Sequence, residues 1–190
     1  MKTSLGRLNA LYPTPTTLVG AMVDGRPNFI TIAYVGIMEH THLSIGMNKS
    51  HYTNAGIKAS GSFSICFPSE DLVVQTDYCG LVSGRDTDKV SLFDLFYGEL
   101  GNAPMIEQCP VCIECRLDRT IDFPSHEVFV GEIVQTYADE AVLREGKIDL
   151  ARVRPLLFDM TSRQYWSLGQ PVAPCWKIGR QLRQGRTDQA

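Results

Sequence analysis

The segment HLSIGMNKSHYTNAGIKASGSFSICF, residues 42–67, predicts a strand, a polar loop, a helix and a second strand in direct succession. Its first six residues alternate apolar with small or polar side chains, which indicates a half-buried strand, and 63–67 form a short strand-like run. The helix is expected to begin near Ser50 or Thr53 and to end at Gly61. The polar loop therefore lies between the end of a strand and the start of a helix.

That loop, Asn48-Lys49-Ser50-His51-Tyr52-Thr53, carries the groups that bind anions. The start of a helix presents unpaired backbone N–H groups and the positive end of the helix dipole. Lys49 adds positive charge, and Ser50 and Thr53 add hydroxyl donors. An ordinary Ser/Thr helix cap beside a solvated lysine is the other interpretation, and the loop taken alone favours it.

Length and composition describe an ordinary folded protein. The 190 residues suffice for one substantial domain. Hydrophobic residues make up 44% and charged residues 21%, with a net charge of −3. The chain has no basic arm or lysine-rich stripe, which argues against a nucleic-acid partner.

The hydropathy of the sequence predicts a cytoplasmic protein. Residues 1–7 lack a hydrophobic signal core, and no apolar run is long enough to span a bilayer, so no membrane partner is expected. In the cytoplasm the cysteines are expected to be mostly reduced thiols. There are six of them: Cys66, Cys79, Cys109, Cys112, Cys115 and Cys175.

Further strands and a few helices complete the pattern. A strand over 17–23, the hairpin turn Asp24-Gly25 and a returning strand over 28–35 come first, with Pro27 at the start of the second strand. The other expected elements are a helix from Glu70 to about Tyr78 with Ser69 as its cap and Gly80 past its end, a polar loop over 83–89, long strands over 111–121 and 127–137, and a helical turn over 148–153. Short strands with few helices favour a mainly β, barrel-like antiparallel sheet with inserted helices.

The cysteine cluster is the most conspicuous candidate for metal or thiol chemistry. Cys109, Cys112 and Cys115 lie close together in the sequence, but a structural zinc site usually needs a second pair at similar spacing. Cys112 and Cys115 point to opposite faces of a strand. We therefore expect small buried hydrophobes and no metal site. The chain also lacks the GxGxxG, GxxxxGK[ST] and GxSxG motifs of dinucleotide-binding proteins, nucleotide triphosphatases and α/β-hydrolases.

Taken in order, the motifs resemble the flavin reductase-like family of FMN-binding split barrels, and within it the flavoredoxins. The resemblance covers about residues 13–169. The pieces that carry it are Asn28-Phe29-Ile30-Thr31 with Tyr34, the Asn48 to Thr53 loop, Gly61-Ser62-Phe63-Ser64-Ile65 with Pro68-Ser69, Cys79-Gly80, Ser83-Gly84-Arg85-Asp86-Thr87-Asp88-Lys89, His126 with Val130-Gly131-Glu132-Ile133, and Gln164-Tyr165-Trp166-Ser167-Leu168-Gly169.

The resemblance implies a single domain over 1–190, a Greek-key split barrel with its core at about 13–169 and a tail at 170–190. It also implies FMN bound at the interface of a homodimer. The implied cofactor-binding residues are Asn28, Thr31 and Tyr34 along the isoalloxazine and ribityl chain, Asn48, Lys49, Ser50 and Thr53 around the phosphate, Lys89 approaching the flavin from its loop, His126 beside the ring, and Tyr165, or its neighbour Trp166, closing over it.

The function implied is electron transfer through bound FMN, with the flavin and no catalytic side chain carrying the chemistry. The electron donor would be a redox partner protein or NAD(P)H. An NAD(P)H-dependent flavin or ferric reductase is one alternative, and a non-redox module that binds another phosphorylated ligand is a second. The family's reductases often have Gly-Asp-His where this chain has Pro124-Ser125-His126, and many relatives have Trp at the position of Tyr34.

Overall fold

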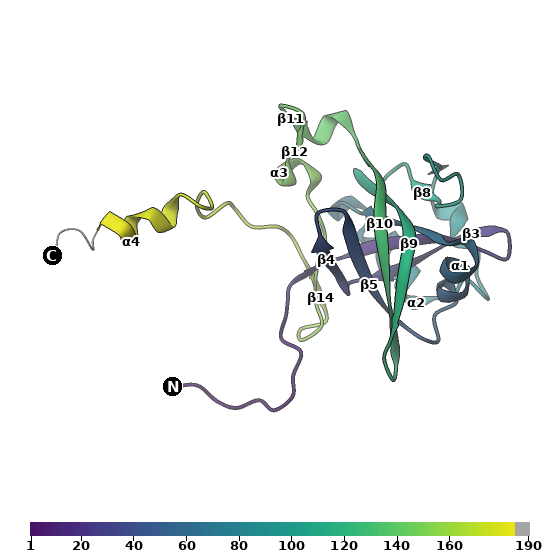
Figure 1. Cartoon of the computed structure of the whole chain (residues 1–190), viewed down its shortest axis with the longest axis horizontal. Coiled ribbons are helices and arrows are strands. Elements are labelled where there is room, and N and C mark those ends of the chain that lie inside the picture. Colours follow the sequence, from purple (N-terminus) through teal and green to yellow (C-terminus); the bar gives the residue numbers. More distant parts are fainter. Residues whose placement is uncertain (185–190) are drawn as a thin grey trace.

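The computed structural model describes residues 1–184, and antiparallel β-structure dominates it (Figure 1). Seven strands form the main sheet in the spatial order β3-β2-β6-β9-β10-β5-β4. Their bounds are Thr17–Val23 (β2), Arg26–Ile32 (β3), Val35–Glu39 (β4), His42–Asn48 (β5), Ser62–Phe67 (β6), Val111–Asp122 (β9) and His126–Ala138 (β10).

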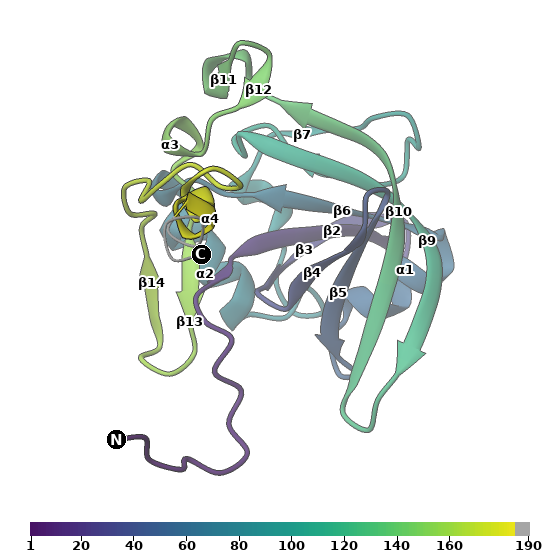
Figure 2. The same cartoon turned by 60° about the vertical axis from the view of Figure 1, so that its left-hand side comes forward.

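The main sheet curls into an open barrel, as the view in Figure 2 shows. Its edge strands are β3 and β4, and within residues 1–184 these two strands are not paired with each other. All neighbouring strands run antiparallel. The predicted mainly β, antiparallel fold is therefore confirmed, with a barrel that is split and not closed.

Smaller elements surround this sheet. A second sheet has the order β1-β13-β14, and two short hairpins join β7 to β8 and β11 to β12. Their bounds are Thr14–Pro15 (β1), Leu157–Asp159 (β13), Gln164–Trp166 (β14), Leu95–Phe96 (β7), Met105–Ile106 (β8), Leu143–Arg144 (β11) and Lys147–Ile148 (β12). The α-helices are Thr53–Ser60 (α1), Val73–Leu81 (α2), Leu150–Val153 (α3) and Gln181–Gln184 (α4), and the 3₁₀ turns are Glu70–Leu72 (η1), Val90–Leu92 (η2), Glu140–Val142 (η3) and Ile178–Arg180 (η4).

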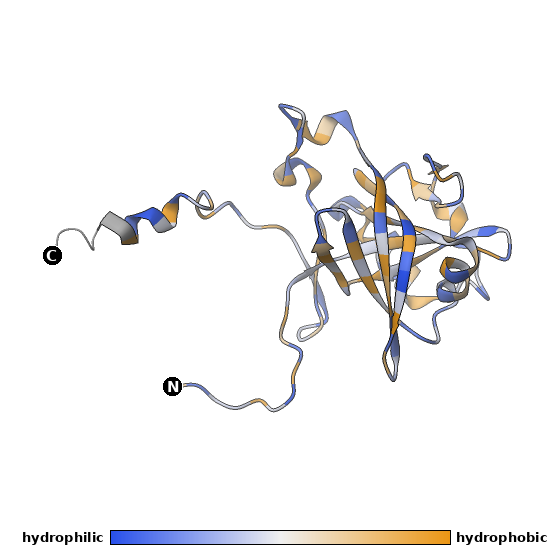
Figure 3. Ribbon diagram, in the orientation of Figure 1, coloured by the Kyte–Doolittle hydropathy of each residue, from blue (hydrophilic) through white to orange (hydrophobic). Residues whose placement is uncertain are grey.

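Two apolar clusters lie on opposite faces of the main sheet. Leu18 and Cys66 belong to one cluster, and their chain neighbours Val19 and Ile65 belong to the other. Successive side chains of a strand point to opposite faces of the sheet, so apolar neighbours in the sequence enter different clusters when both faces are covered. Figure 3 shows the alternation as bands of orange and blue along β9 and β10.

The hairpin turn between β2 and β3 is formed as predicted. Asp24 and Gly25 have φ values of 50° and 75°, the left-handed pair that a tight two-residue turn requires. The returning strand ends at Ile32 and not at Val35. Pro27 lies inside this strand, which is tolerated because β3 is an edge of the sheet.

The helices match the sequence expectation in place but differ at their ends. α1 ends at Gly61, whose φ of 66° is left-handed as expected of a terminating glycine. Its N-cap is Tyr52, and no side chain caps it, so the interpretation of the loop as a Ser/Thr cap is wrong. α2 continues to Leu81, which places Gly80 inside the helix and not past its end.

Both ends of the described chain extend away from the barrel (Figure 1). The described part of the tail, 170–184, carries apolar side chains that contact water, among them Val172 and Trp176. The remaining six tail residues, 185–190, lie outside the described residues. Within residues 1–184, no helix is long and apolar enough to cross a membrane.

Candidate functional site

A cleft of about 400 Å³, here called the central cleft, opens where the end of β3, the end of β5, α2 and the second sheet meet. Five residues singled out from the sequence line it together: Thr31, Tyr34, Asn48, His126 and Tyr165. They come from β3, the link between β3 and β4, β5, β10 and β14. Segments far apart in the sequence therefore converge on one concave site.

An aromatic pair forms one side of the central cleft. The ring centroids of Tyr34 and His126 lie 6.1 Å apart, with the ring planes inclined by 34°. Ser125 Oγ lies 2.9 Å from His126 Nδ1. A hydroxyl carries no charge, so this neighbour orients the imidazole without supplying the negative charge that a carboxylate would.

Tyr165 and α2 form another side of the central cleft. The Tyr165 hydroxyl donates a 2.9 Å hydrogen bond to Asp77 Oδ1. Burial, and then this hydrogen bond, raise the pKa of Tyr165 to about 12. Thr31 donates its hydroxyl to the Thr76 carbonyl, which ties β3 to the same helix. The neighbouring Trp166 lines a different cavity and is half exposed.

Two buried polar atoms belonging to the lining of the central cleft have no hydrogen-bond partner within the described chain. They are Thr16 Oγ1 and His51 Nδ1. Burial lowers the pKa of His51, and the charges of His126 and Lys89 lower it further. A buried polar atom without a partner costs free energy unless water or a ligand satisfies it. The cleft thus combines aromatic and apolar walls with unsatisfied polar atoms.

A second hollow, here called the side pocket, has a volume of about 580 Å³ and lies at the other end of β3. Asn28 and Lys89, both predicted site residues, line it. The Asn28 amide donates a 2.7 Å hydrogen bond to the Thr53 hydroxyl at the start of α1. Lys89 Nζ donates to the carbonyls of Cys79 and Val82 at 3.3 and 3.2 Å, and burial lowers the pKa of this amine.

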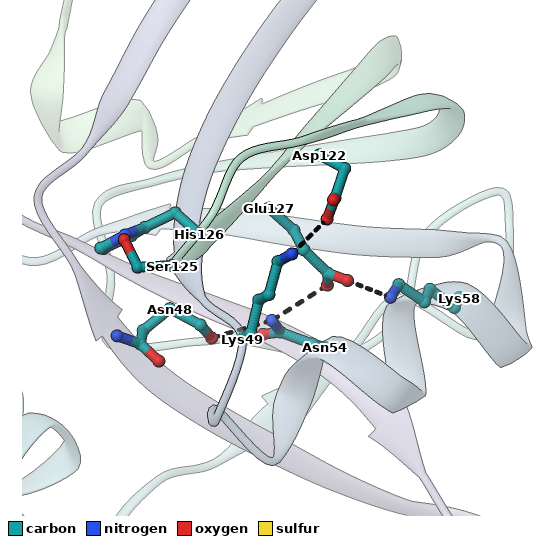
Figure 4. Close-up of polar contacts among 8 residues, drawn as sticks. All are labelled: Asn48, Lys49, Asn54, Lys58, Asp122, Ser125, His126 and Glu127. Atoms are coloured by element: carbon teal, nitrogen blue, oxygen red, sulfur yellow. Dashed lines mark hydrogen bonds and ion pairs between the residues drawn. The ribbon is translucent and has the colours of Figure 1, made fainter.

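The other three predicted residues, Lys49, Ser50 and Thr53, belong to the lining of neither hollow. Thr53 is buried, whereas Lys49 and Ser50 are exposed. Lys49 Nζ forms a 2.7 Å ion pair with Asp122 Oδ1 (Figure 4). The backbone N–H and the hydroxyl of Ser50 both donate to Asn48 Oδ1, at 3.0 and 2.8 Å. Both side chains are therefore engaged within the protein.

The β9–β10 hairpin is fastened to α1 by a small polar network (Figure 4). Glu127 accepts hydrogen bonds from Lys58 and from the amide of Asn54, the latter at 3.2 Å. The backbone N–H of Lys49 donates to the Ser125 carbonyl at 3.1 Å. Because His126 lies between Ser125 and Glu127, these contacts hold its backbone at the edge of the central cleft.

Sequence reasoning missed several lining residues. His51 was inside the quoted loop, where its histidine type was a usable signal. Asp77 and Arg85 stood within segments read as a helix and a polar loop, and nothing in their immediate sequence sets them apart. Thr16 precedes β2 and has no pattern of its own.

The cysteines are more closely grouped than their sequence positions suggest. Cys66 lies opposite Cys112 in the β6–β9 register, and both belong with Cys109 to one buried apolar cluster. Cys115 belongs to the apolar cluster on the other face of the sheet, as expected from its spacing. No group of three or more His, Cys, Asp or Glu side chains suited to a metal ion occurs among the described residues.

Comparison with known proteins identifies the family to which this architecture belongs. Residues 8–167 match the model of the flavin reductase like domain. The structure resembles flavoredoxin from Methanosarcina acetivorans (43% identity, TM-score 0.93, covering 96% of this chain and 99% of the other). It also resembles flavoredoxin of Desulfovibrio vulgaris (35% identity, TM-score 0.88, covering 94% and 100%). A high molecular weight rubredoxin of Moorella thermoacetica is 24% identical over 140 residues, or 73% of this chain and 56% of that protein. The chain thus belongs to the flavin reductase-like domain family.

Proposed function

We propose that this protein is an FMN-binding flavoprotein that transfers electrons through its bound flavin. The observation that carries the proposal is the central cleft of this flavin reductase-like domain, which Tyr34, His126 and Tyr165 line together with two residues, Thr16 and His51, whose buried polar atoms lack a partner within the described chain. A planar heteroaromatic ring with polar edges suits such a lining, because its faces contact the aromatic and apolar side chains while its edges accept or donate hydrogen bonds. Similarity to two flavoredoxins supports the same function.

FMN, and not FAD or riboflavin, is the proposed flavin. FMN consists of one ring system and one phosphate joined by a ribityl chain. Strand β3 contributes a residue to each of two hollows, Thr31 to the central cleft and Asn28 to the side pocket, so one hollow can take the ring and the other the phosphate. The chain lacks the GxGxxG fingerprint that accompanies many dinucleotide sites. Thr31, Tyr34, His126 and Tyr165 would surround the ring, as the family resemblance implies.

The flavin, when bound, supplies the redox chemistry, and the protein supplies binding, orientation and electrostatics. Tyr34 and Tyr165 exclude water from two sides of the cleft. Lys89 stabilises negative charge nearby, because Coulomb interactions strengthen where water is excluded. His51 and His126 offer ring nitrogens to the polar edge of the ligand.

An NAD(P)H-dependent flavin or ferric reductase is the second candidate function. The observation that favours it is an adjoining pocket of about 320 Å³ that shares Tyr34 and His126 with the central cleft. This pocket leaves room for a small electron donor or acceptor beside the flavin. Stopped-flow reduction of the holoprotein by NADH separates the two, since rapid reduction favours the reductase and slow reduction favours a partner protein.

The decisive first experiment is an absorbance spectrum of the purified protein, followed by titration with FMN, FAD and riboflavin. A yellow protein that retains FMN in a 1:1 ratio and binds riboflavin more weakly supports the proposal. A colourless protein that ignores all three flavins refutes it and favours the non-redox alternative, a binding module for another phosphorylated ligand.

We further propose a cytoplasmic homodimer built from one domain, with a core at about 13–169 and a tail at 170–190. Exposed apolar side chains on the N-terminal arm and the tail, such as Leu11 and Val172, support a second copy as their cover. The free, mostly buried cysteines agree with a reducing compartment. Light scattering of the holoprotein is expected to give twice the 21.1 kDa chain mass, and a monomer would contradict the dimer.

A further inference from the structure

We propose that the β13–β14 hairpin is a lid of the central cleft, and that Asp77 is the positioning residue that latches it shut through Tyr165. The latch concerns this chain alone, whereas control of flavin entry and release by the lid rests on the proposed function. The family resemblance implies a place beside the flavin for Tyr165 and none for Asp77.

The hairpin is a thin wall between two cavities, and Figure 2 shows it standing beside the barrel. Phe158 and Tyr165, a cross-strand pair, line the central cleft. Leu157 and Trp166, the next pair, line a cavity of about 590 Å³ on the other side. Neither strand contributes a residue to the apolar clusters of the described chain. A wall with a cavity on each side has room to swing.

The turn between the two strands makes the hairpin a rigid unit. Asp159 Oδ1 accepts a 2.8 Å hydrogen bond from the backbone N–H of Thr161, and the Ser162 hydroxyl donates to Asp159 Oδ2 at 2.7 Å. The rings of Phe158 and Tyr165, with centroids 6.0 Å apart, join the strands on the side of the cleft. Both rings therefore move together when the hairpin moves.

The base of the hairpin is fastened to the segment that leads into α2. The Arg154 guanidinium pairs with Asp71 at 2.9 Å and with Glu70 at 3.1 Å. The Arg154 carbonyl also accepts a 2.9 Å hydrogen bond from the backbone N–H of Glu70. Pro155 then forms an isolated β-bridge with Ser69. These contacts hold the chain just before β13 begins and make this end the hinge.

The far strand, β14, is held much more lightly. It is the free edge of its sheet and pairs with β13 alone. The Tyr165 hydroxyl donates to Asp77 Oδ1 at 2.9 Å, and within residues 1–184 no other side-chain hydrogen bond joins β14 to a different element. A hydrogen bond from a phenol to a carboxylate is charge-assisted. The pKa of Tyr165, raised to about 12, keeps the donor protonated at neutral pH.

The partner of this latch is fixed independently of it. Asp77 directly follows Thr76, whose carbonyl accepts a hydrogen bond from the Thr31 hydroxyl on β3. A Cβ added at Gly80 would lie 3.3 Å from Thr31 Cβ, so α2 packs closely on the same strand. Asp77 itself is exposed, so its replacement removes the acceptor without opening a cavity in the core. Breaking the latch therefore frees the hairpin and leaves α2 in place.

The first test uses the apoprotein and so does not depend on the flavin. Amide hydrogen exchange over 157–166 is measured by mass spectrometry in wild type, Asp77→Ala, Tyr165→Phe and the double variant. Each single variant is expected to exchange about three- to tenfold faster there, the range of one net hydrogen bond. The double variant is expected to exchange no faster than the faster single variant, because both changes remove the same bond.

Two further variants control this measurement. Asp77→Asn keeps an oxygen acceptor for the Tyr165 hydroxyl and is expected to stay within about twofold of wild type. Tyr78→Phe removes a hydroxyl from an exposed neighbour on the same helix and is expected to leave exchange over 157–166 unchanged.

The second test measures the rates at which FMN enters and leaves, followed by stopped-flow fluorescence of the flavin. In Asp77→Ala both rates are expected to rise about three- to tenfold, while the dissociation constant changes by less than about threefold. A gate that opens more often speeds passage in both directions, whereas loss of a contact to the bound flavin speeds release alone. Tyr78→Phe is again the control.

Four outcomes would overturn one part or another. Unchanged exchange in both single variants would refute the latch, and so would additive effects in the double variant. Faster exchange with FMN entry no faster than in wild type would refute control of the cofactor by the lid. A wild-type protein whose latch passes the exchange test but that binds no flavin would refute the proposed function and leave the latch standing.

Discussion

Asn28 on β3 and Thr53 at the start of α1, 25 positions apart, are joined by a buried hydrogen bond of 2.7 Å from amide nitrogen to hydroxyl oxygen. The bond fixes the end of an edge strand against the helix start that the side pocket adjoins. The contact is tightly enclosed, because a Cβ added at Gly84 would come within 1.9 Å of Asn28 Oδ1. Fold and proposed cofactor site therefore share one polar contact.

Asn28→Ala is expected to lower the free energy of unfolding of the apoprotein by about 1–3 kcal/mol, because the buried Thr53 hydroxyl loses its donor. Urea denaturation measures the effect. Asn9→Ala on the exposed N-terminal arm is the matched control and is expected to change stability by less than about 0.5 kcal/mol. Indistinguishable midpoints for Asn28→Ala and wild type would show that the bond contributes nothing net.

Lys89→Met is expected to lower the reduction potential of the bound flavin. The reduced flavin carries extra negative charge, and each tenfold loss of its relative affinity corresponds to about 30 mV for a two-electron couple. Because burial lowers the pKa of Lys89, its charge is lost at lower pH than that of an ordinary lysine, so the difference from wild type narrows as pH rises.

Redox titration of the FMN-loaded proteins measures this effect. Lys147→Met, on the exposed strand β12, is the control. Lys58 is unsuitable as a control because its side chain donates a hydrogen bond to Glu127. Equal potentials in wild type and Lys89→Met, with FMN retained, would mean that the lysine does not act on the ring.

His51 is expected to make the apoprotein sensitive to acid. Burial, followed by the charges of His126 and Lys89, lowers its pKa below the ordinary 6.5, so the folded state binds its proton less readily than the unfolded state. Stability is then lost as pH falls from about 6.5 toward the lower folded-state value. In His51→Gln this part of the loss disappears, whereas His40→Gln, at an exposed position, retains it. The test is to measure the free energy of unfolding of wild type, His51→Gln and His40→Gln at pH 7 and pH 5. An equal loss of stability in all three proteins would exclude His51 as the cause.

The buried thiols are expected to be structural. Burial raises the pKa of Cys115 to about 12, so it is protonated and unreactive at neutral pH. Cys112→Ala and Cys115→Ala are each expected to cost roughly 1–3 kcal/mol of stability while the rate and extent of flavin reduction stay close to wild type. Anaerobic reduction of the holoproteins measures this. A variant that keeps its fold and FMN but loses electron transfer would assign the thiols a redox role.

Local patterns in the sequence were enough to place most strands, since alternation and turn residues act over a few positions. The end of α2 was misjudged for a physical reason. Gly80 was interpreted as a helix stop, but a Cβ at this position would lie 3.3 Å from Thr31 Cβ, so the glycine permits close packing of α2 on β3. A glycine required by packing and one required by a turn look identical in a sequence.

The candidate site was predictable only where a motif carried it. Thr31, Tyr34, Asn48, His126 and Tyr165 meet in one cleft, as an ordered set of short motifs had suggested. The state of each charge was not predictable, because it depends on distant partners. Lys49 is neutralised by Asp122, 73 positions away, and Lys89 is buried by segments that its own polar loop does not reveal.

The exposed C-terminal region determines what intrinsic fluorescence can report. The two tryptophans of the chain, Trp166 and Trp176, are 51% and 90% exposed and lie outside the seven-stranded sheet, whose core holds phenylalanines instead. Indole emission from a protomer whose tail is not covered by a second copy should therefore resemble that of a solvated indole and change little when the barrel melts. Trp166 directly follows Tyr165 of the central cleft, so a flavin bound in that cleft would quench its emission by energy transfer. Tryptophan fluorescence in this protein is a gauge of cofactor occupancy and a poor gauge of folding.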